Sequence, residues 1–253
     1  MSKYVLITGA YGGLGEAMAA VYASHGYGLV LLGRNPEKLQ TLEKKFTAQT
    51  PVISIECDVS NWVQCQSAYN QLQTENIQIS VLINNAGITY IKTLDEEYDI
   101  ERYQQLIATN LNGVVYMTKL FLNDIRVHKG SIINISSVIG YAPVIGRTAY
   151  AASKFGMEGF FSVLDAEQHD AVHIMMVYPT FIATGIRKDV KGKKEVNEIL
   201  TADYVADKIY TGMTKRQKKL YLGSTALKSK LLYKYFPKIY VHLMRQKISK
   251  TTT

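Results

Sequence analysis

A tyrosine and a lysine four residues apart form a candidate pair for acid–base chemistry. Tyr150 and Lys154 lie in TAYAASKFG, and their spacing puts both side chains on one face of a helix. A free tyrosine has a pKa of about 10, and a neighbouring ammonium favours the phenolate. We therefore expect Lys154 to bring the pKa of Tyr150 towards neutral pH, where the phenol can exchange a proton with a substrate oxygen. Ser137, thirteen residues before Tyr150, could donate a hydrogen bond to that oxygen.

A glycine-rich turn follows the first apolar run of the chain. In TGAYGGLG, Thr8, Gly9, Gly13 and Gly15 fit the pattern T-G-x-x-x-G-x-G. Glycines let a backbone approach a pyrophosphate, and the helix that follows offers free N–H groups and its positive dipole end. Such a loop alone can also be an ordinary tight turn. Its place directly after the first predicted strand favours a dinucleotide site.

Short apolar runs alternate with helical stretches along the chain. The predicted strands are Tyr4–Thr8, Gly28–Leu32, Val52–Cys57, Val81–Asn84, Ser131–Ser136, Val172–Tyr178 and Lys219–Leu222. The predicted helices lie near residues 13–25, 36–48, 61–75, 98–126, 150–168, 202–214 and 226–247. Apolar strands separated by helices predict a parallel sheet covered on both faces. We expect one doubly wound α/β Rossmann-type domain over residues 1–225 and a basic amphipathic extension over residues 226–253.

In combination, these motifs resemble those of the classical short-chain dehydrogenase/reductase family. The resemblance implies hydride transfer between a nicotinamide cofactor and a carbonyl or alcohol carbon. It implies a tetrad of Asn110, Ser137, Tyr150 and Lys154, in which Lys154 also holds the nicotinamide ribose and Asn110 holds a water that links Lys154 to solvent. The other implied cofactor contacts are Thr8, Gly9, Gly13, Leu14, Gly15, Asp58, Val59, Asn85, Ala86, Gly87, Pro179, Ile182 and Thr184. Thr180 departs from the family pattern, because a glycine commonly follows the proline.

The end of the second predicted strand bears on the choice of cofactor. Many NAD-dependent family members carry an aspartate there, whereas this chain has Gly33 followed by Arg34. A carboxylate would repel a 2′-phosphate and a guanidinium can pair with it, so NADP(H) is predicted over NAD(H). Asn35 and Lys38 could assist. The alternative is that Arg34 is a solvated arginine that stacks on adenine, and Gly12 stands where some NADP-preferring relatives have a basic residue.

The predicted substrate segments lie near residues 88–98, 138–147 and 180–200 and are largely apolar. Their apolar members are Tyr90, Val138, Tyr141, Val144, Ile145 and Phe181. We therefore expect a lipophilic ketone, aldehyde or alcohol as the substrate. The nearby cations could bind an anionic group but are more simply solvated loop charges; they are Arg147, Arg187, Lys188, Lys191, Lys193 and Lys194.

Composition and charge limit the partners and the location. The net charge is +8, yet twelve Lys and Arg and no acidic residue follow Asp207, so the body is mildly acidic. No nucleic-acid motif accompanies this charge, and an anionic membrane surface is the better candidate partner. Cys57 and Cys65 are predicted to be reduced thiols, and no metal site is expected. The start of the chain has no signal-peptide pattern, which predicts a cytoplasmic protein.

The C-terminal stretch 226–247 has helical amphipathicity. Lys230, Lys234, Lys238 and Arg245 share one face of a continuous helix, and the opposite face carries Leu232, Phe236, Ile239, Tyr240 and Leu243. Pro237 should kink or split the helix. Peripheral contact with the inner face of a membrane, packing on the enzyme body and packing on another subunit all remain open. The family resemblance implies a homodimer or homotetramer.

Two functional classes follow from the sequence. The first is an NADP(H)-dependent carbonyl reductase or alcohol dehydrogenase. The second is a catalytically silent, NADP(H)-sensing binding protein on the same fold, which the intact tetrad disfavours. A sugar-nucleotide epimerase could share the Tyr150 and Lys154 spacing, but the glycine spacing and the short C-terminal region fit it less well.

Overall fold

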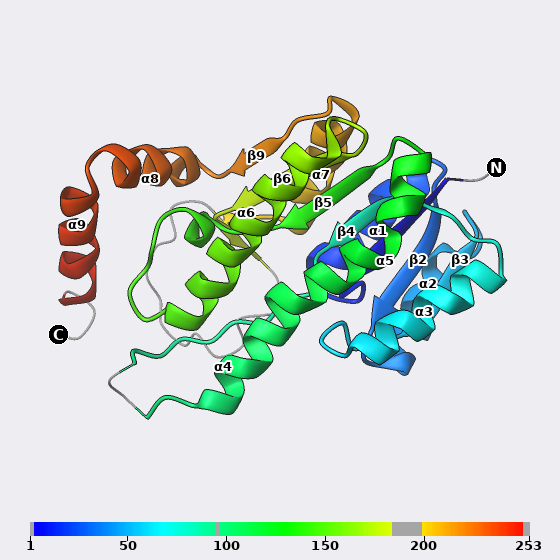
Figure 1. The fold of residues 1–253 in the computed structure, drawn as a ribbon, viewed down its shortest axis with the longest axis horizontal. Coiled ribbons are helices and arrows are strands. Elements are labelled where there is room, and N and C mark those ends of the chain that lie inside the picture. Colours follow the sequence, from blue (N-terminus) through cyan, green and yellow to red (C-terminus); the bar gives the residue numbers. More distant parts are fainter. Residues whose placement is uncertain (1–2, 95–96, 184–198, 250–253) are drawn as a thin grey trace.

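A seven-stranded, fully parallel sheet forms the centre of the molecule (Figure 1). The computed structural model describes residues 3–94, 97–183 and 199–249. The strands run in the order β3-β2-β1-β4-β5-β6-β9. Their bounds are β1 Tyr4–Thr8, β2 Gly28–Gly33, β3 Val52–Glu56, β4 Ile79–Asn84, β5 Ser131–Ile135, β6 His173–Pro179 and β9 Lys219–Leu222. This arrangement confirms the predicted doubly wound fold.

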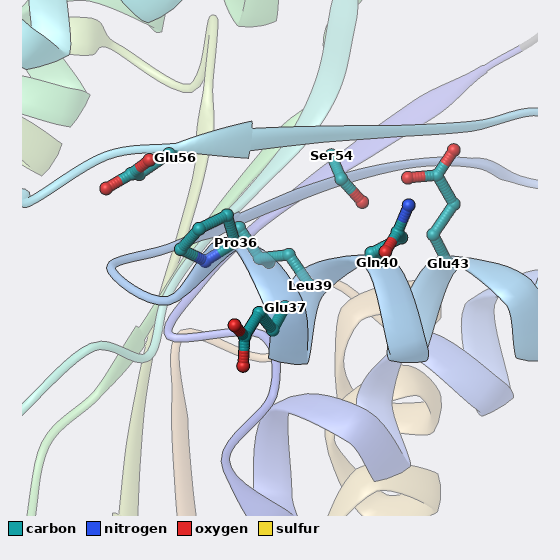
Figure 2. Close-up of a pocket in the computed structure, with 7 residues that line it drawn as sticks. All are labelled: Pro36, Glu37, Leu39, Gln40, Glu43, Ser54 and Glu56. Carbon is teal, nitrogen blue, oxygen red and sulfur yellow. The ribbon is translucent and has the colours of Figure 1, made fainter.

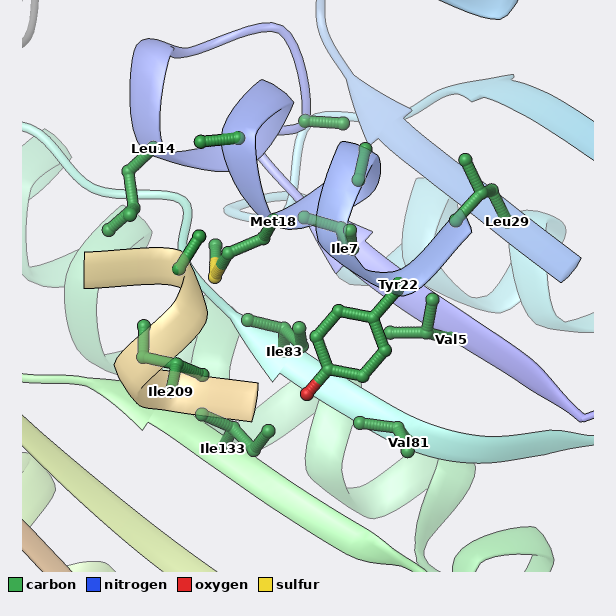
Figure 3. Packing of buried hydrophobic residues seen from close by; sticks show 14 of the residues in the cluster. Val5, Ile7, Leu14, Met18, Tyr22, Leu29, Val81, Ile83, Ile133 and Ile209 are labelled. Atoms are coloured by element: carbon green, nitrogen blue, oxygen red, sulfur yellow. The ribbon is translucent and has the colours of Figure 1, made fainter. Parts of the chain in front are cut away.

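Helices cover both faces of this sheet, because successive strand residues point to opposite sides. On one face α1 (Gly13–Ser24), α2 (Pro36–Phe46) and α7 (Ala202–Thr214) pack on residues such as Ile7 and Leu29, which are labelled in Figure 3. On the other face α3 (Trp62–Thr74), α5 (Gly113–Val127) and α6 (Thr148–Gln168) pack on neighbours such as Leu6 and Val30. The strands are therefore buried on both sides, which explains their continuous apolar sequences.

Two predicted helices are divided in the structure. The stretch predicted near 98–126 consists of α4 (Ile100–Ile107), a π-helical turn over Ala108–Asn112, and α5. The C-terminal stretch consists of α8 (Ser224–Tyr235) and α9 (Pro237–Ser249), because Phe236 leaves the helical conformation before the proline. None of the helices within the described ranges combines the length and the apolar character needed to cross a bilayer.

The order of the strands reverses between β1 and β4, and ligands of such sheets bind where this reversal opens a crevice at the carboxyl ends. The glycine-rich turn follows β1, and the segment Asn84–Gly87, whose sequence is NNAG, begins at the end of β4. A two-residue parallel pair, β7 (Phe181–Ile182) with β8 (Ile199–Leu200), lies beyond β6 and had no counterpart among the predicted strands. The fold thus brings the sequence motifs to one edge of the sheet.

Candidate active site

The glycine-rich turn and the NNAG segment are joined by main-chain and side-chain hydrogen bonds. The Thr8 hydroxyl donates to the carbonyl of Ile83 at 3.2 Å and accepts from the N–H groups of Asn85 and Ala86, both at 3.0 Å. The Asn85 amide donates back to the carbonyls of Thr8 and Gly9 at 2.9 and 3.1 Å. Thr8 and Asn85 therefore hold the turn in place. Thr8 itself does not line the cavity described next.

A cavity of about 170 Å³ lies between these two segments. Its lining includes ten of the predicted cofactor contacts, which are Gly9, Gly13, Leu14, Gly15, Arg34, Asp58, Val59, Asn85, Ala86 and Gly87. Helix α1 begins beside it, and its N-cap residue Gly12 offers no side-chain hydrogen bond. The N–H groups of the first turn of α1 are consequently available to an anion, as a nucleotide pyrophosphate requires.

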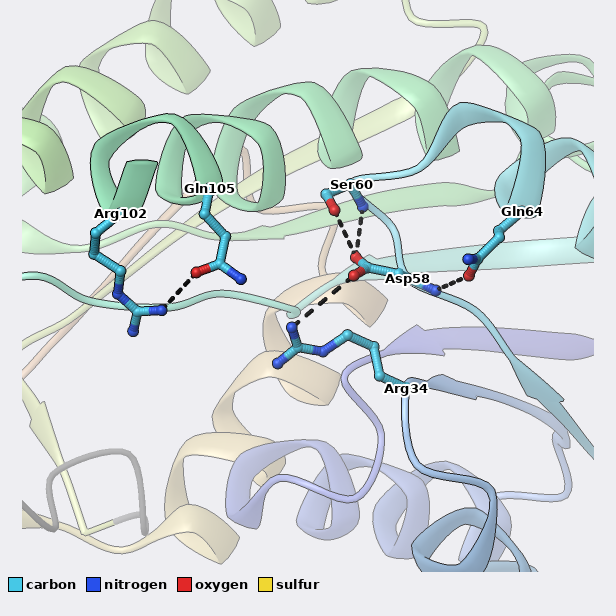
Figure 4. Close-up of polar contacts among 6 residues, drawn as sticks. All are labelled: Arg34, Asp58, Ser60, Gln64, Arg102 and Gln105. Atoms are coloured by element: carbon cyan, nitrogen blue, oxygen red, sulfur yellow. Dashed lines mark hydrogen bonds and ion pairs between the residues drawn. The ribbon is translucent and has the colours of Figure 1, made fainter. Parts of the chain in front are cut away.

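Arg34 and Asp58 stand together at one side of this cavity (Figure 4). A guanidinium nitrogen of Arg34 lies 4.0 Å from a carboxylate oxygen of Asp58, and half of the Arg34 side chain is exposed. The other carboxylate oxygen of Asp58 accepts from the hydroxyl and the N–H of Ser60 at 2.7 and 3.0 Å. Asp58 is thus held in position. Among the described residues, the ion pair of Arg34 with Asp58 is long and solvated, so it contributes little stability.

The space beside Gly33, at the end of β2, is occupied by an aromatic ring. The ring of Tyr11 lies against Gly33, and a Cβ at that position would come within 2.4 Å of it. Lys38 approaches the same ring, with its ammonium 5.6 Å from the centroid. An aspartate at position 33 is therefore incompatible with this placement of Tyr11.

Asn35, which was predicted to assist Arg34 at the cofactor, caps a helix in the structure. Its side-chain oxygen accepts a hydrogen bond from the N–H of Lys38 at 2.8 Å and caps the start of α2. This bond satisfies an N–H group that the helix itself cannot satisfy. The bond stabilises the start of α2, and the predicted contact of Asn35 with the cofactor stays a prediction.

A second cavity, of about 320 Å³, lies along α2 and β3 at the edge of the sheet (Figure 2). Glu37, Glu43 and Glu56 line it. Three carboxylates make this cavity unfavourable for an anionic nucleotide. The smaller cavity at the glycine-rich turn is the better candidate for a cofactor site.

The predicted pair of Tyr150 and Lys154 lies near the N-terminal end of α6, with the lysine ammonium 5.7 Å from the tyrosine ring centroid. Lys154 is 4% exposed, and its ammonium donates to the carbonyl of Ile135 at 2.8 Å. This carbonyl belongs to the last residue of β5, two residues before Ser137. Burial lowers the pKa of Lys154 to about 8, and the charge of Glu158 opposes this change.

Asn110 is fully buried in the π-helical turn and connects two other segments. Its side-chain oxygen accepts from the N–H of Ile88 at 2.8 Å, and its amide donates to the carbonyl of Ile88 at 2.9 Å and to the hydroxyl of Ser153 at 3.3 Å. Ser153 in turn donates to the carbonyl of Tyr150 at 2.8 Å. The side chain of Asn110 therefore positions the helical turn that carries Tyr150; its predicted hold on a water stays a prediction.

Ser137 follows β5 and is 8% exposed. Its hydroxyl oxygen accepts from the N–H of Ile139 at 3.3 Å and so caps a short 3₁₀ turn, Val138–Gly140. Accepting this bond leaves the hydroxyl hydrogen free to point to another acceptor. The neighbouring Ser136 is directed to Glu158, at 3.4 Å, which supports the choice of Ser137 as the substrate-facing serine.

The sequence reasoning missed a polar and aromatic cluster behind Lys154. Glu158 lies one helical turn after Lys154 and accepts from the hydroxyl of Tyr178 at 2.8 Å. The ring of Tyr178 stacks on that of Tyr221, with centroids 4.8 Å apart. Burial raises the pKa of Glu158, while the bonds from Tyr178 and Ser136 lower it. Only the spacing of four between Lys154 and Glu158 was readable in the sequence.

The cavity also has lining residues that the sequence reasoning missed, namely Tyr11, Gly12, Gly33, Ile88 and Thr109. The hydroxyl of Thr109 is buried and has no hydrogen-bond partner within the described ranges. A buried hydroxyl without a partner is unfavourable in the free protein and can be satisfied by a ligand. The position of Thr109 directly before Asn110 was the only feature of the sequence that could have indicated its place at the cavity.

Two of the predicted substrate residues, Tyr90 and Tyr141, already have hydrogen-bond partners. The Tyr90 hydroxyl accepts from the N–H of Asp99 at 2.9 Å, and the Tyr141 hydroxyl donates to the carbonyl of Ala226 at 2.6 Å. Val138 and Val144 are partly buried, and Ile145 and Phe181 are exposed. Arg147 donates to the hydroxyl of Thr89. Thr184, Arg187, Lys188, Lys191, Lys193 and Lys194 lie outside the described residues.

This chain is similar in sequence to known proteins. A sequence profile described as short chain dehydrogenase matches residues 3–195. The 11-beta-hydroxysteroid dehydrogenase A of Sesamum indicum is 34% identical over 182 residues, which are 71% of this chain and 52% of that protein. The chain thus matches about half the length of this relative.

Solved structures of similar fold include complexes with both nicotinamide cofactors. A short-chain dehydrogenase from Sphingobium yanoikuyae in complex with NADPH is 25% identical, with a TM-score of 0.78 and coverage of 87% of both chains. A short chain dehydrogenase/reductase from Burkholderia phymatum in complex with NAD is 23% identical, with a TM-score of 0.83 and coverage of 94% of this chain and 95% of that chain. These structures share the fold and differ in the cofactor bound.

Proposed function

Because this chain belongs to the short-chain dehydrogenase/reductase family of oxidoreductases, we propose that it exchanges a hydride between NADP(H) and a carbonyl or alcohol carbon of a lipophilic small molecule. The observation that carries the choice of cofactor is the end of β2. Gly33 carries no carboxylate, and Arg34 lines the cavity with half of its side chain exposed. With NADPH as the cofactor in a cytosol, reduction of the carbonyl compound is the expected main direction of the reaction.

The free energies of the two possible interactions of Arg34 favour its guanidinium turning from Asp58 to the 2′-phosphate of NADP(H). An exposed ion pair of the kind formed by Arg34 and Asp58 is worth about 0–1 kcal/mol. A hydrogen bond between charged partners is worth about 1.5–3 kcal/mol. Exchanging the first interaction for the second is therefore favourable, and Asp58 keeps its hydrogen bonds to Ser60 after the exchange.

The described residues fit a dinucleotide at the glycine-rich turn. The uncapped N–H groups of α1 are suited to the pyrophosphate, Arg34 to the 2′-phosphate and Asp58 to the adenine. The hydroxyl of Thr109 is free to bond the cofactor as well. Pro179 and Ile182 remain candidates for the nicotinamide end, by resemblance, as does Thr184. When bound, the nicotinamide supplies or accepts the hydride.

Three side chains would transfer the proton and stabilise the charges that arise during the reaction at the substrate oxygen. Tyr150 donates the proton to the carbonyl oxygen in reduction and removes it in oxidation. The ammonium of Lys154, held by the carbonyl of Ile135, stabilises the phenolate that reduction leaves on Tyr150. Ser137 donates a hydrogen bond to the same substrate oxygen and so stabilises the charge that develops there.

A lipophilic substrate is supported by two observations. The described residues of the predicted substrate segments include the exposed apolar side chains Ile145 and Phe181. The sesame relative carries the name of a hydroxysteroid dehydrogenase, and steroids are lipophilic. A panel of hydrophobic ketones, aldehydes and alcohols is therefore the first choice for activity assays.

The experiment that tests the cofactor assignment compares kcat/KM for NADPH and NADH in the wild type and in Arg34→Ala. We expect the wild type to prefer NADPH and the variant to lose about 10- to 100-fold of kcat/KM with NADPH, while the NADH value changes little. Arg126→Ala is the matched control, because Arg126 is exposed on α5 and bonds Gln168. A wild-type preference for NADH would refute the assignment. Tight NADPH binding without turnover of any substrate would instead identify the binding-protein alternative.

A further inference from the structure

The C-terminal segment, defined as α8 and α9, follows β9 at the edge of the sheet (Figure 1), and α8 is anchored to the enzyme body. Ala226 is fully buried, and its carbonyl accepts the hydroxyl of Tyr141 at 2.6 Å. On α9, Tyr240 is 7% exposed, and its ring lies 5.3 Å from that of Tyr233 on α8. Contacts of α8 with the enzyme body and of α9 with α8 therefore account for the buried residues Ala226 and Tyr240.

The exposed residues of the segment, called its outer side, include apolar side chains on both helices and at the junction between them. Leu227, Leu231 and Tyr235 follow each other at intervals of four on α8 and are 49%, 46% and 61% exposed. Phe236, Ile239 and Leu243 are exposed as well. Single exposed apolar residues are common on protein surfaces, but six of them within seventeen residues indicate a binding surface.

The division of the segment changes which residues form this surface. In one continuous helix, Leu232 and Tyr240 would share the apolar face with Phe236. In the structure Tyr240 is buried and Leu232 is partly buried, whereas Leu227 and Leu231 are exposed. The apolar surface is consequently shifted relative to the one that the continuous helix predicts.

The charges around this surface are all of one sign. Lys228 and Lys234 are exposed on either side of the Leu227, Leu231 and Tyr235 row, given 100° of rotation per residue. The chain contains no Asp or Glu after Asp207. A symmetric contact with a second copy would therefore oppose like charges.

We propose that the outer side of α8 and α9 binds the surface of a membrane leaflet that contains anionic lipids. Leucines and aromatic residues between lysines match the interface of such a leaflet, where apolar side chains enter the headgroup region and the ammonium groups meet the phosphates. Lys230 does not take part, because its ammonium lies over the ring of Tyr221 and donates to that hydroxyl. The proposal is independent of the cofactor and the substrate of the enzyme.

Point variants test this surface better than a truncation, since removal of the segment would also remove the partners of Tyr141. Co-sedimentation with vesicles is measured at physiological ionic strength, with phosphatidylglycerol mixed with phosphatidylcholine and with phosphatidylcholine alone. The full chain is expected to bind only the anionic vesicles. Lys228→Gln with Lys234→Gln should weaken binding about 25-fold, which is about fivefold for each cation. Leu227→Ser with Leu231→Ser should weaken binding about tenfold or more.

Matched controls carry the same changes elsewhere. Val63→Ser with Val127→Ser, and Lys44→Gln with Lys119→Gln, alter side chains that are exposed outside the segment, and both should bind like the wild type. Near-UV circular dichroism establishes that each variant is folded. Absence of binding by the folded wild type, or equal losses in the controls, would overturn the proposal. If the variants of the segment lose self-association in sedimentation velocity while their vesicle binding is unchanged, the surface is a contact between copies of the chain instead.

Discussion

Replacing Glu158 with glutamine is expected to move the alkaline limb of the pH profile for reduction to lower pH. Lys154 is enclosed, and burial lowers its pKa to about 8. The carboxylate of Glu158 lies one helical turn away and favours the charged ammonium, so it raises the pKa of Lys154. Removing this charge leaves burial unopposed. A larger fraction of Lys154 is then neutral at a given pH above 7 and no longer stabilises the phenolate of Tyr150.

The size of this shift follows from the geometry of the helix. Two unit charges about 6 Å apart, in a medium of effective dielectric constant about 20, interact by about 3 kcal/mol, or two pKa units. Glu158 is only partly buried, so solvent screening reduces the expected shift to about one unit. A decrease of this size from the pKa of about 8 lowers the charged fraction of Lys154 at pH 7.5 from about three quarters to one quarter. Activity should fall about threefold at pH 7.5 and remain nearly unchanged at pH 6.

The assay is kcat/KM for reduction by NADPH between pH 6 and 9. Tyr178→Phe is the first control, because it removes the hydrogen bond to Glu158 and keeps the charge; its alkaline limb should stay in place. Glu167→Gln is the second control, because it removes an exposed carboxylate from the same helix. An alkaline limb in Glu158→Gln that is unchanged or shifted upwards would refute the reasoning. Apparent pKa values belong to the coupled pair of Tyr150 and Lys154, so the comparison rests on the shift between variants.

Three further outcomes are expected. Tyr150→Phe should lower kcat by about 100-fold or more and leave the Kd for NADPH unchanged in a fluorescence titration; full activity would exclude Tyr150 as the proton donor. Gly223→Ala should lower the free energy of unfolding by about 2–3 kcal/mol in urea titrations, because Gly223 has φ +99° and a Cβ there would meet the hydroxyl of Thr180. Adding Thr180→Gly should restore the part due to the clash, and an equal loss in the double variant would contradict this cause. Thr109→Val should leave stability unchanged or slightly higher and raise the Kd for NADPH about two- to tenfold; an unchanged Kd would mean that its unpartnered hydroxyl does not meet the cofactor.

The elements and several groups of the candidate site were predictable because their signals are local. The apolar strands, the glycine-rich turn and the four-residue spacing of Tyr150 and Lys154 involve neighbours in the chain, and the structure has all three. The cap that Asn35 forms on α2 was not predicted, and the predicted contact of Asn35 with the cofactor stays a prediction. Its N-cap bond to Lys38 was itself readable as Asn-Pro before a helical stretch.

Other features depend on residues that are distant in the sequence. Thr180 departs from the family pattern, and the structure places it against Gly223, which lies 43 residues further along and has no side chain. Likewise, Tyr11 occupies the space beside Gly33, and Tyr178 and Ser136 meet at Glu158. No periodicity links such residues, since they become neighbours only when the sheet and its helices pack.

The sequence by itself determined the order of strands and helices, the glycine-rich turn and the helical pairing of Tyr150 with Lys154. These features follow from hydrophobic periodicity and from the conformational preferences of single residues. The tertiary structure decided which residues surround Lys154, which side chain occupies the space beside Gly33, and which apolar residues of α8 and α9 remain exposed. Burial and close packing are set by the whole chain, and they determine the charge of a lysine or the exposure of a leucine.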